Sequence, residues 1–274
     1  MQEVFLETKQ ELVRFLENYL TSCKKEFSQV NGWAGDSCER LLAYVQRGKM
    51  LRGSLVVLFA TRLGASREDA VRAGAAMELL QSGVLVHDDI MDGDLVRRGA
   101  ASMHAQLEEV GGSSFGLGGG ICVGDVSLFM AFDVLNSCSQ PQPLVSLFSR
   151  EAISLGCGQM QDVWLGVADQ EPGVEDILHV YKYKTGRYSF SLPLLLGACL
   201  AEREDLYSSL EAFGMELGVS FQVRDDVLGL FGSEQETGKP VGADVREDKK
   251  TVVRFELLRL LEGEQLRWAE SLFG

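Results

Sequence analysis

Two aspartate pairs close long apolar segments of the chain, and the spacing within the first motif suits metal binding. Asp88 and Asp92 are four positions apart, so their carboxylates share one face of a helix, with Cβ atoms roughly 5–6 Å apart. Like charges at that distance repel each other, which favours a positive partner. Mg²⁺ suits this role because it accepts one or two carboxylates and takes its other ligands from water and phosphate oxygens. The alternative is a solvated helix end.

Basic side chains accompany this first motif. Arg97 and Arg98 follow it in the chain, and Lys49 and Arg52 share a face at the start of another predicted helix. Guanidinium groups bind phosphate through two parallel hydrogen bonds, and a helix start adds backbone N–H groups. A salt bridge from Arg97 or Arg98 to Asp94 is the alternative interpretation of the two arginines.

The second pair, Asp225 and Asp226, has similar neighbours. Its basic and hydroxyl residues are Lys182, Lys184 and Thr185 in a helical region, and Lys239, Lys249 and Lys250 in or after a polar loop. Two acidic clusters among several basic clusters fit a site in which metal ions bridge carboxylates to a diphosphate. Lys and Arg side chains would hold the remaining phosphate charge.

Helices must position these residues, because helical periodicity recurs along the chain and strand alternation is almost absent. The predicted helices span residues 3–29, 50–63, 66–91, 117–136, 142–166, 174–185, 188–202, 204–231 and 250–272. Ser66 is a candidate N-cap, and residues 232–248 are predicted to form a loop. The glycine cluster at 111–120 is interpreted as a flexible helix entry with close helix packing, since no strand precedes it to support a dinucleotide-binding loop. The expected fold is all-α.

Composition argues against several other functions. The 274 residues include 26 Lys and Arg against 40 Asp and Glu, a net charge of −14, which disfavours nucleic acid or an acidic membrane as partner. Apolar runs fall short of the ~20 residues that a membrane-spanning helix needs, and the N-terminus lacks the pattern of a secretion signal. The 6 cysteines form no CxxC pair, so reduced thiols and a cytoplasmic location are expected.

Five motifs, in order along the chain, resemble the trans-isoprenyl diphosphate (polyprenyl) synthase family, and within it the geranylgeranyl diphosphate synthases. They are GKMLR, ELLQSGVLVHDDIMD with RRG, YKTG, FQVRDDVLG and TGKPVGADVREDKKT. The resemblance implies a single all-α domain over residues 1–274, a helical bundle around a central cavity, and a homodimer. It also implies Mg²⁺-dependent condensation of isopentenyl diphosphate with an allylic diphosphate (dimethylallyl, geranyl or farnesyl) into a longer all-trans polyprenyl diphosphate, with release of diphosphate.

The same resemblance assigns roles to individual residues. Metal binding, by three Mg²⁺ ions in the family, falls to Asp88, Asp92 and Asp225, with Asp89 in support. Isopentenyl diphosphate would be held by Lys49, Arg52, Gln81 and Arg98. The allylic diphosphate would be surrounded by Arg97, Lys184, Thr185, Gln222, Lys239 and Lys249. The residues expected to act in catalysis are Asp88, Asp92, Arg97, Lys184, Asp225 and Lys239.

The length of the product is expected to depend on the helix that ends at Asp88. The product tail would run beside this helix, with Leu80, Gly83 and Val84 forming the floor of its cavity. Farnesyl-forming relatives often place aromatic rings here, whereas Gly83 and Val84 are interpreted as leaving room. A C20 or C25 product is therefore expected, and Gly83→Phe should shorten it by steric clash.

The sequence departs from the family pattern in the GKMLR entry, where Met50 and Gly53 replace the frequent Arg and Pro without changing the expected phosphate contacts, and in two further places. Gly229 stands where many members have a third Asp in the second acidic motif, and Asp225 is expected to keep its metal role. The chain ends at Gly274, earlier than most members, so incomplete C-terminal helices are expected.

Three other interpretations compete with this one. A class I terpene cyclase shares the fold and an acidic motif but needs no isopentenyl diphosphate site, so Lys49, Arg52 and Arg98 argue against it. A non-catalytic partner subunit of a synthase heteromer generally loses the metal-binding aspartates, which this chain keeps. A purely structural helical protein would not be expected to keep the basic groups at the family's spacing.

Overall fold

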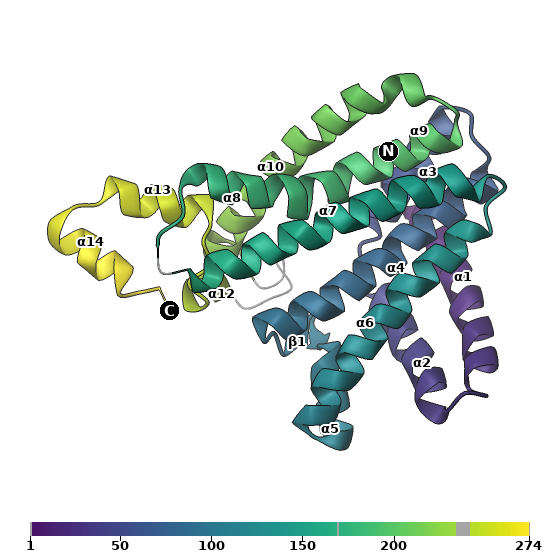
Figure 1. Cartoon of the computed structure of the whole chain (residues 1–274), viewed down its shortest axis with the longest axis horizontal. Helices are drawn as coiled ribbons and strands as arrows, with labels where there is room; N and C mark the ends of the chain where they lie inside the picture. Colours follow the sequence, from purple (N-terminus) through teal and green to yellow (C-terminus); the bar gives the residue numbers. More distant parts are fainter. Residues whose placement is uncertain (1, 169, 234–241, 274) are drawn as a thin grey trace. The chain divides into compact units, whose positions relative to one another are not determined.

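The computed structural model describes residues 2–168, 170–233 and 242–273, and these are helical nearly throughout (Figure 1). The exception is a short antiparallel hairpin of β1 (Val96–Arg97) and β2 (Ala100–Ala101). The predicted all-α fold is thus confirmed. The chain divides into two compact units, Met1–Phe148 with Pro193–Tyr207, and Ser149–Leu192 with Ser208–Gly274. The single domain over residues 1–274 stays a prediction.

The first unit contains most of the N-terminal helices. They are α1 (Gln2–Phe27), α2 (Gly32–Gln46), α3 (Leu51–Arg62), α4 (Arg67–Asp92), α5 (Met103–Gly111) and α6 (Ser113–Asn136), joined by most of α9 (Leu192–Leu200) and a 3₁₀ turn, η2 (Glu204–Leu206). The long helix α7 (Pro141–Val167) begins in this unit and ends in the second. The second unit contains α8 (Val174–Val180), a π-helix η1 (Tyr181–Ser191), α10 (Tyr207–Phe231), α12 (Ala243–Arg246), α13 (Val252–Leu260) and α14 (Gly263–Glu270).

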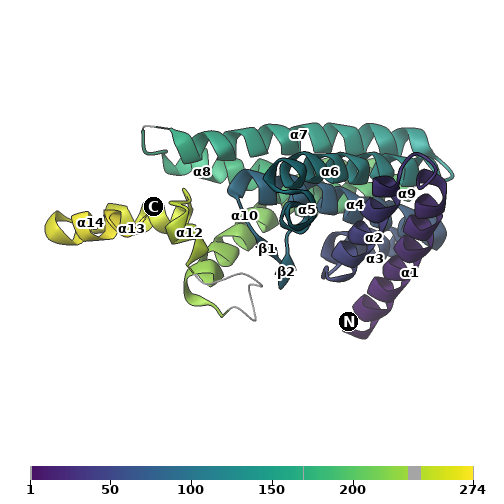
Figure 2. The ribbon, with the colours of Figure 1, turned by 90° about the horizontal axis from the view of Figure 1, so that it is seen from below.

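Helix α4 is the central helix of the first unit, and small residues let its neighbours approach closely. It begins where the Ser66 hydroxyl accepts a hydrogen bond from the Asp69 N–H, and it ends at Gly93, whose φ of 69° is left-handed. A Cβ added to Gly74 would lie 2.7 Å from the Gly53 carbonyl oxygen of α3. Because real Cβ atoms do not approach a carbonyl this closely, only glycine at position 74 permits this spacing between α3 and α4. Figures 1 and 2 both show α4 beside α6.

The glycine cluster lies mostly inside α6 rather than before it. Gly112, with a φ of 80°, separates α6 from the unpredicted helix α5. A Cβ on Gly116 would meet the His104 carbonyl oxygen of α5 at 2.8 Å, which agrees with the expected close helix packing. Among the described residues, α6 is the one helix long and apolar enough to cross a membrane, with mean hydropathy 1.6. Core helices of soluble proteins meet the same criterion, so the expected absence of a membrane span stays a prediction.

Several predicted boundaries are wrong. The predicted break between residues 185 and 188 is absent, because the π-helix continues α8 directly into α9. The predicted helix over 250–272 is two helices, interrupted before Gly263, which has a φ of 59°. Helices α2 and α12 were not predicted, and α12 falls inside the predicted loop.

In the second unit, glycines bring α10 against the π-helix. A Cβ on Gly218 would lie 2.0 Å from the Gly186 Cα, and one on Gly214 would lie 2.5 Å from the Ser191 N. Figure 2 shows α8 alongside the end of α7, where Leu165 and Ile177 share an apolar cluster with residues of α10 and α13. The π-helix is therefore held by backbone contact with α10 on one side.

We predict that Gly218→Ala destabilises the protein, because the added methyl group must push the π-helix and α10 apart. Overpacking of this kind costs about 1–3 kcal/mol, measurable as a lower midpoint of thermal or urea unfolding. Gly156→Ala in α7 is the matched control, since a Cβ there meets nothing within 4 Å. It should stabilise the helix by about 0.5–1 kcal/mol. Equal effects of the two substitutions would contradict the prediction.

Candidate active site

The first acidic motif occupies the last turn of α4, and its first two aspartates differ sharply in exposure. The Asp88 side chain is 18% exposed and that of Asp89 is fully buried. Asp92, one turn later, is half-buried. The Tyr44 hydroxyl donates a hydrogen bond of 3.3 Å to Asp89 Oδ2. Asp89 is therefore an anchoring residue, whereas Asp88 and Asp92 present carboxylates nearer the surface.

Arg97 compensates the negative charge of this motif. Its Nη2 lies 3.0 Å from Asp94 Oδ2 and 3.7 Å from Asp88 Oδ2, and it also forms a closer ion pair with Asp89. Burial opposes the charged form of Arg97, but the carboxylate of Asp89 prevails and raises its pKa. The salt bridge to Asp94 noted as an alternative is present, and it coexists with the predicted position beside the aspartates.

Arg98 belongs to the same cluster but faces the GKMLR turn. It has a left-handed φ of 53°, and its Nη1 donates a 3.1 Å hydrogen bond to the Tyr44 carbonyl oxygen. The guanidinium also lies over the Tyr44 ring, 5.4 Å from its centroid. A Cβ on Gly48 would come within 2.9 Å of Arg98 Nη1. Glycine at position 48 therefore makes room for this arginine.

A buried glutamate missed by sequence reasoning organises the start of α3. Glu78 is 4% exposed, and its Oε1 accepts a 2.7 Å hydrogen bond from the Gly53 N–H. Burial raises the pKa of Glu78, and the charges of Arg52 and Arg98 oppose this shift, which places both arginines near it. The sequence feature that could have pointed to Glu78 was a single acidic residue among apolar and small residues of the helix.

The predicted isopentenyl diphosphate residues all fall in the first unit. Gln81 is buried on α4, three positions after Glu78 and hence on a similar face, while Lys49 is exposed before α3. Arg52 and Arg98 are half-buried. The structure thus brings Arg52 and Arg98 together around Glu78 and leaves Lys49 at the surface.

The second acidic motif repeats the arrangement of the first. Asp225 is exposed near the end of α10, whereas Asp226 is 3% exposed. Asp226 accepts hydrogen bonds from the Tyr181 hydroxyl and from Gln222 Nε2, the latter at 2.9 Å. Burial, with a contribution from Asp244, raises the pKa of Asp226 to about 6 in spite of these donors.

Three residues of the π-helix make polar contacts here, and two of them, Tyr181 and Thr185, connect to the second acidic motif. The Thr185 hydroxyl donates to Gln222 Oε1 at 2.8 Å, so Thr185, Gln222 and Asp226 form one hydrogen-bonded chain. Lys184 Nζ forms a 2.6 Å ion pair with Asp162 Oδ2 of α7. Tyr181 is the third of these residues, and the sequence analysis missed it. The only feature of the sequence that pointed to Tyr181 was its place three positions before Lys184.

The position of Gly229 has a local explanation. A Cβ there would lie 2.9 Å from Asp244 Oδ2, so the space of a longer side chain is taken by Asp244. The Gly242 N–H donates to the Gly229 carbonyl oxygen at 2.9 Å, and the Lys249 N–H donates to that of Asp244 at 2.9 Å. Lys249 is therefore tied to the acidic motif. The predicted Lys239 lies outside the described residues.

The interpretation of Gly83 as open space beside the product tail is wrong. A Cβ on Gly83 would lie 2.8 Å from the Gly124 carbonyl oxygen and 2.9 Å from Leu128, both in α6. Gly83 therefore permits close contact between helices. Of the other two residues, Leu80 is 2% exposed and Val84 is half-buried.

The chemistry of these residues fits magnesium. Asp88 and Asp92 offer hard carboxylate oxygens beside a compensating arginine, and no cysteine lies in this turn. Within residues 2–168, 170–233 and 242–273, no three His, Cys, Asp or Glu residues gather into a metal site of their own. Magnesium needs no such cage, because it completes its octahedron with water and substrate phosphates.

The chain is similar to known proteins in sequence and in structure. The Polyprenyl synthetase family matches residues 36–274. Geranylgeranyl diphosphate synthase of Sulfolobus acidocaldarius is 34% identical over 84% of this chain and 69% of its own length. Geranylgeranyl diphosphate synthase of Saccharolobus solfataricus is 34% identical over 83% of this chain and 68% of its own length.

A solved structure is also similar. Geranylgeranyl pyrophosphate synthase from Corynebacterium glutamicum, complexed with isoprenyl diphosphate and magnesium, has a TM-score of 0.91 at 27% identity, covering 98% of this chain and 81% of that one. The family match covers most of the chain, and both acidic motifs and their basic neighbours are present. The chain belongs to the polyprenyl synthetase family and is a trans-prenyltransferase of the isoprenyl diphosphate synthase type.

Proposed function

We propose that the protein condenses isopentenyl diphosphate with an allylic diphosphate to give geranylgeranyl diphosphate, with the C25 homologue as the alternative product. The observation that carries this proposal is the Asp88 carboxylate beside Arg97, at 3.7 Å, in the last turn of α4. A carboxylate and a guanidinium group held together at a helix end suit a metal-bound diphosphate, because the diphosphate offers negative charge to both Mg²⁺ and arginine. The names of the relatives support a C20 product.

The reaction follows from ionisation of the allylic substrate. Its C–O bond breaks, the double bond of isopentenyl diphosphate attacks the resulting allylic cation, and a proton then leaves the new chain, accepted by the released diphosphate. Bound Mg²⁺, three ions in this proposal, would stabilise the charge that develops on the leaving diphosphate. Asp88, Asp92 and Asp225 would hold these ions. Asp89 and Asp226 anchor the motifs through Arg97 and Tyr181, respectively.

The basic residues divide between the two substrates. Isopentenyl diphosphate would bind to Lys49, Arg52, Gln81 and Arg98, where buried Glu78 fixes the start of α3. The allylic diphosphate would bind to Arg97, Lys184, Thr185, Gln222, Lys239 and Lys249. Support for the second set comes from the hydrogen-bonded chain of Thr185, Gln222 and Asp226. Catalysis would rest on Asp88, Asp92, Arg97, Lys184, Asp225 and Lys239.

A homodimer in the cytoplasm is also part of the proposal. Helix α6 exposes an apolar row, in which Leu117 is 52%, Ile121 43% and Phe129 73% exposed. These residues recur every four or eight positions and so share one face. A second copy of the chain would cover this face. In such a dimer, each of the two units within a chain would keep its own acidic motif.

The direct test is an assay with isopentenyl diphosphate, each allylic diphosphate in turn, and Mg²⁺, followed by chromatography of the products. We expect mainly C20 product, and condensation should stop when Mg²⁺ is chelated. No condensation with any primer would overturn the proposed activity and favour a non-catalytic partner subunit. A mainly C15 product would overturn the proposed length.

Asp88→Ala should lower turnover by about 100-fold or more, the scale seen when a group that stabilises transition-state charge is lost. The fold should persist, because Asp88 is less buried than its neighbour Asp89. Glu109→Ala on α5, an exposed carboxylate of the same unit, is the control. Full activity of Asp88→Ala would remove Asp88 from the metal site.

Val84→Phe should shorten the product, because Val84 is four positions before Asp88 and so shares its helix face. Gly83→Phe should instead destabilise the protein, since the ring would meet the Gly124 backbone of α6. Product chromatography checks the first substitution and thermal unfolding the second. An unchanged product from Val84→Phe, or a stable and active Gly83→Phe, would contradict this assignment of the two side chains.

A further inference from the structure

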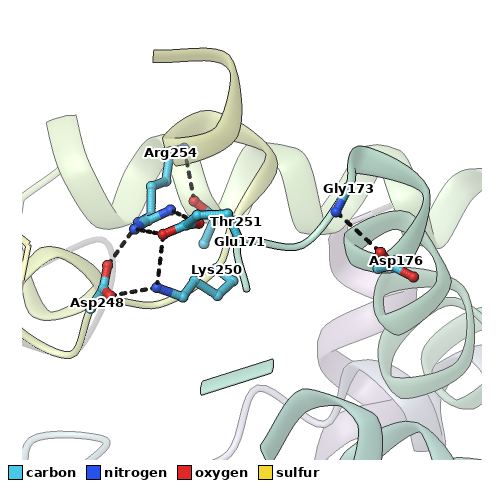
Figure 3. A network of polar contacts seen from close by, with 7 residues as sticks. All are labelled: Glu171, Gly173, Asp176, Asp248, Lys250, Thr251 and Arg254. Carbon is cyan, nitrogen blue, oxygen red and sulfur yellow. Dashed lines mark hydrogen bonds and ion pairs between the residues drawn. The ribbon is translucent and has the colours of Figure 1, made fainter. Parts of the chain in front are cut away.

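A network of ion pairs in the second unit has no role in the reaction as described. It consists of Glu171, which follows α7, and Asp248, Lys250 and Arg254 around the start of α13 (Figure 3). Two carboxylates face two cations, so the network is neutral. The Arg254 and Lys250 side chains are only 8% and 10% exposed. Loss of a carboxylate partner would leave a largely buried cation uncompensated, which is more costly than the same loss at the surface.

Arg254 lies at the centre of the network. Its Nη1 and Nη2 donate to the two carboxylate oxygens of Glu171 at 2.6 and 2.8 Å, and its Nε donates to Asp248 Oδ1 at 2.7 Å. The Arg254 backbone N–H donates to the Thr251 hydroxyl at 3.1 Å, which caps α13. One arginine thus binds the turn before α13 to the loop after α7.

The turn has an uncommon backbone conformation. Asp248 has a left-handed φ of 48°, a region that residues other than glycine adopt infrequently. Its carboxylate accepts hydrogen bonds from Arg254 and Lys250. The reversal at Asp248 directs the Lys249 N–H to the Asp244 carbonyl oxygen, at 2.9 Å.

Lys249 lies between two members of the network, Asp248 and Lys250. Its backbone N–H donates to the carbonyl oxygen of Asp244, and the carboxylate of Asp244 lies against Gly229, four positions after Asp225 in the second acidic motif. On the other side of the turn, the Val252 N–H donates to the Tyr181 hydroxyl at 3.0 Å, and that hydroxyl donates to Asp226. The backbone is therefore fixed on both sides of Lys249.

We propose that Arg254, through its ion pairs with Glu171 and Asp248, is a positioning residue that holds Lys249 at the diphosphate site beside the second acidic motif. This inference rests on the proposed function, because it assumes that Lys249 binds the diphosphate. A guanidinium is required, since only its planar fork can bind Glu171 through two hydrogen bonds and Asp248 through a third.

The test measures binding of inorganic diphosphate with excess Mg²⁺ by calorimetry, which does not depend on turnover. Arg254→Met keeps an unbranched side chain and removes the three ionic hydrogen bonds, and we expect the Kd to rise about tenfold. Arg259→Met is the matched control, because Arg259 is on the same helix, is 59% exposed and pairs only with Glu256 among the contacts described. Its Kd should stay within twofold of the wild-type value.

A double substitution separates positioning from general stabilisation. Lys249→Ala should weaken binding about tenfold, and adding Arg254→Met to Lys249→Ala should cause no further loss. An additive loss, or equal Kd values for Arg254→Met and Arg259→Met, would overturn the inference while leaving the proposed function intact. A Kd that Lys249→Ala leaves unchanged would overturn the inference and remove Lys249 from the proposed diphosphate site, whereas the product assay decides the proposed activity itself.

A second variant guards against misfolding of Arg254→Met. Glu171→Gln leaves α13 unaltered, and Glu171 is 62% exposed, so this protein should fold. It should raise the Kd about threefold, and again only when Lys249 is present. An effect of Glu171→Gln that persists in the Lys249→Ala background would also overturn the inference.

Discussion

Each of the two acidic motifs depends on compensation of carboxylate charge near a helix end. Two adjacent aspartates close both α4 and α10, and in each pair the second residue is buried, Asp89 fully and Asp226 to 3% exposure. A buried carboxylate is stable only when donors or cations surround it. Asp89 has Arg97 and Tyr44, and Asp226 has Tyr181 and Gln222.

The two members of each aspartate pair lie in different surroundings. The buried member fixes the last turns of the helix, while the other member, Asp88 or Asp225, lies nearer the surface, where the proposed function assigns it to a metal ion. Tyrosine serves both motifs, through Tyr44 in the first unit and Tyr181 in the second. A tyrosine hydroxyl can stabilise a buried carboxylate without adding a charge that would compete with a metal ion for the exposed one.

The sequence was informative wherever local pattern determines structure. Helical periodicity predicted the long helices α4, α6, α7 and α10, and the acidic and basic motifs predicted the family. The π-helix was missed because its path depends on contact between Gly186 and Gly218, which are far apart in sequence. The role of Gly83 was misjudged for the same reason, since the absence of a side chain can mean either open space or a close neighbour.

Glu78 and Tyr181 show a related limit of sequence reasoning. Each residue acquires its role only when another helix presents a backbone N–H or a carboxylate to it. Conversely, Arg97 was predicted to lie near the aspartates on sequence proximity alone. The structure places it there because a short hairpin follows α4 and leaves few other places for its side chain.

The acidity of the chain has a consequence for substrate binding. The cations assigned to the diphosphates already have carboxylate partners, as Arg97 has Asp89 and Lys184 has Asp162. A diphosphate arriving alone would compete with these carboxylates and would also meet the repulsion of Asp88 and Asp92. In the proposed function, Mg²⁺ bound by the aspartates would remove that repulsion, so metal and diphosphate would favour each other's binding. In a chain with a net charge of −14, the metal ions would then supply much of the attraction for the diphosphate, and the basic residues would contribute position and specificity.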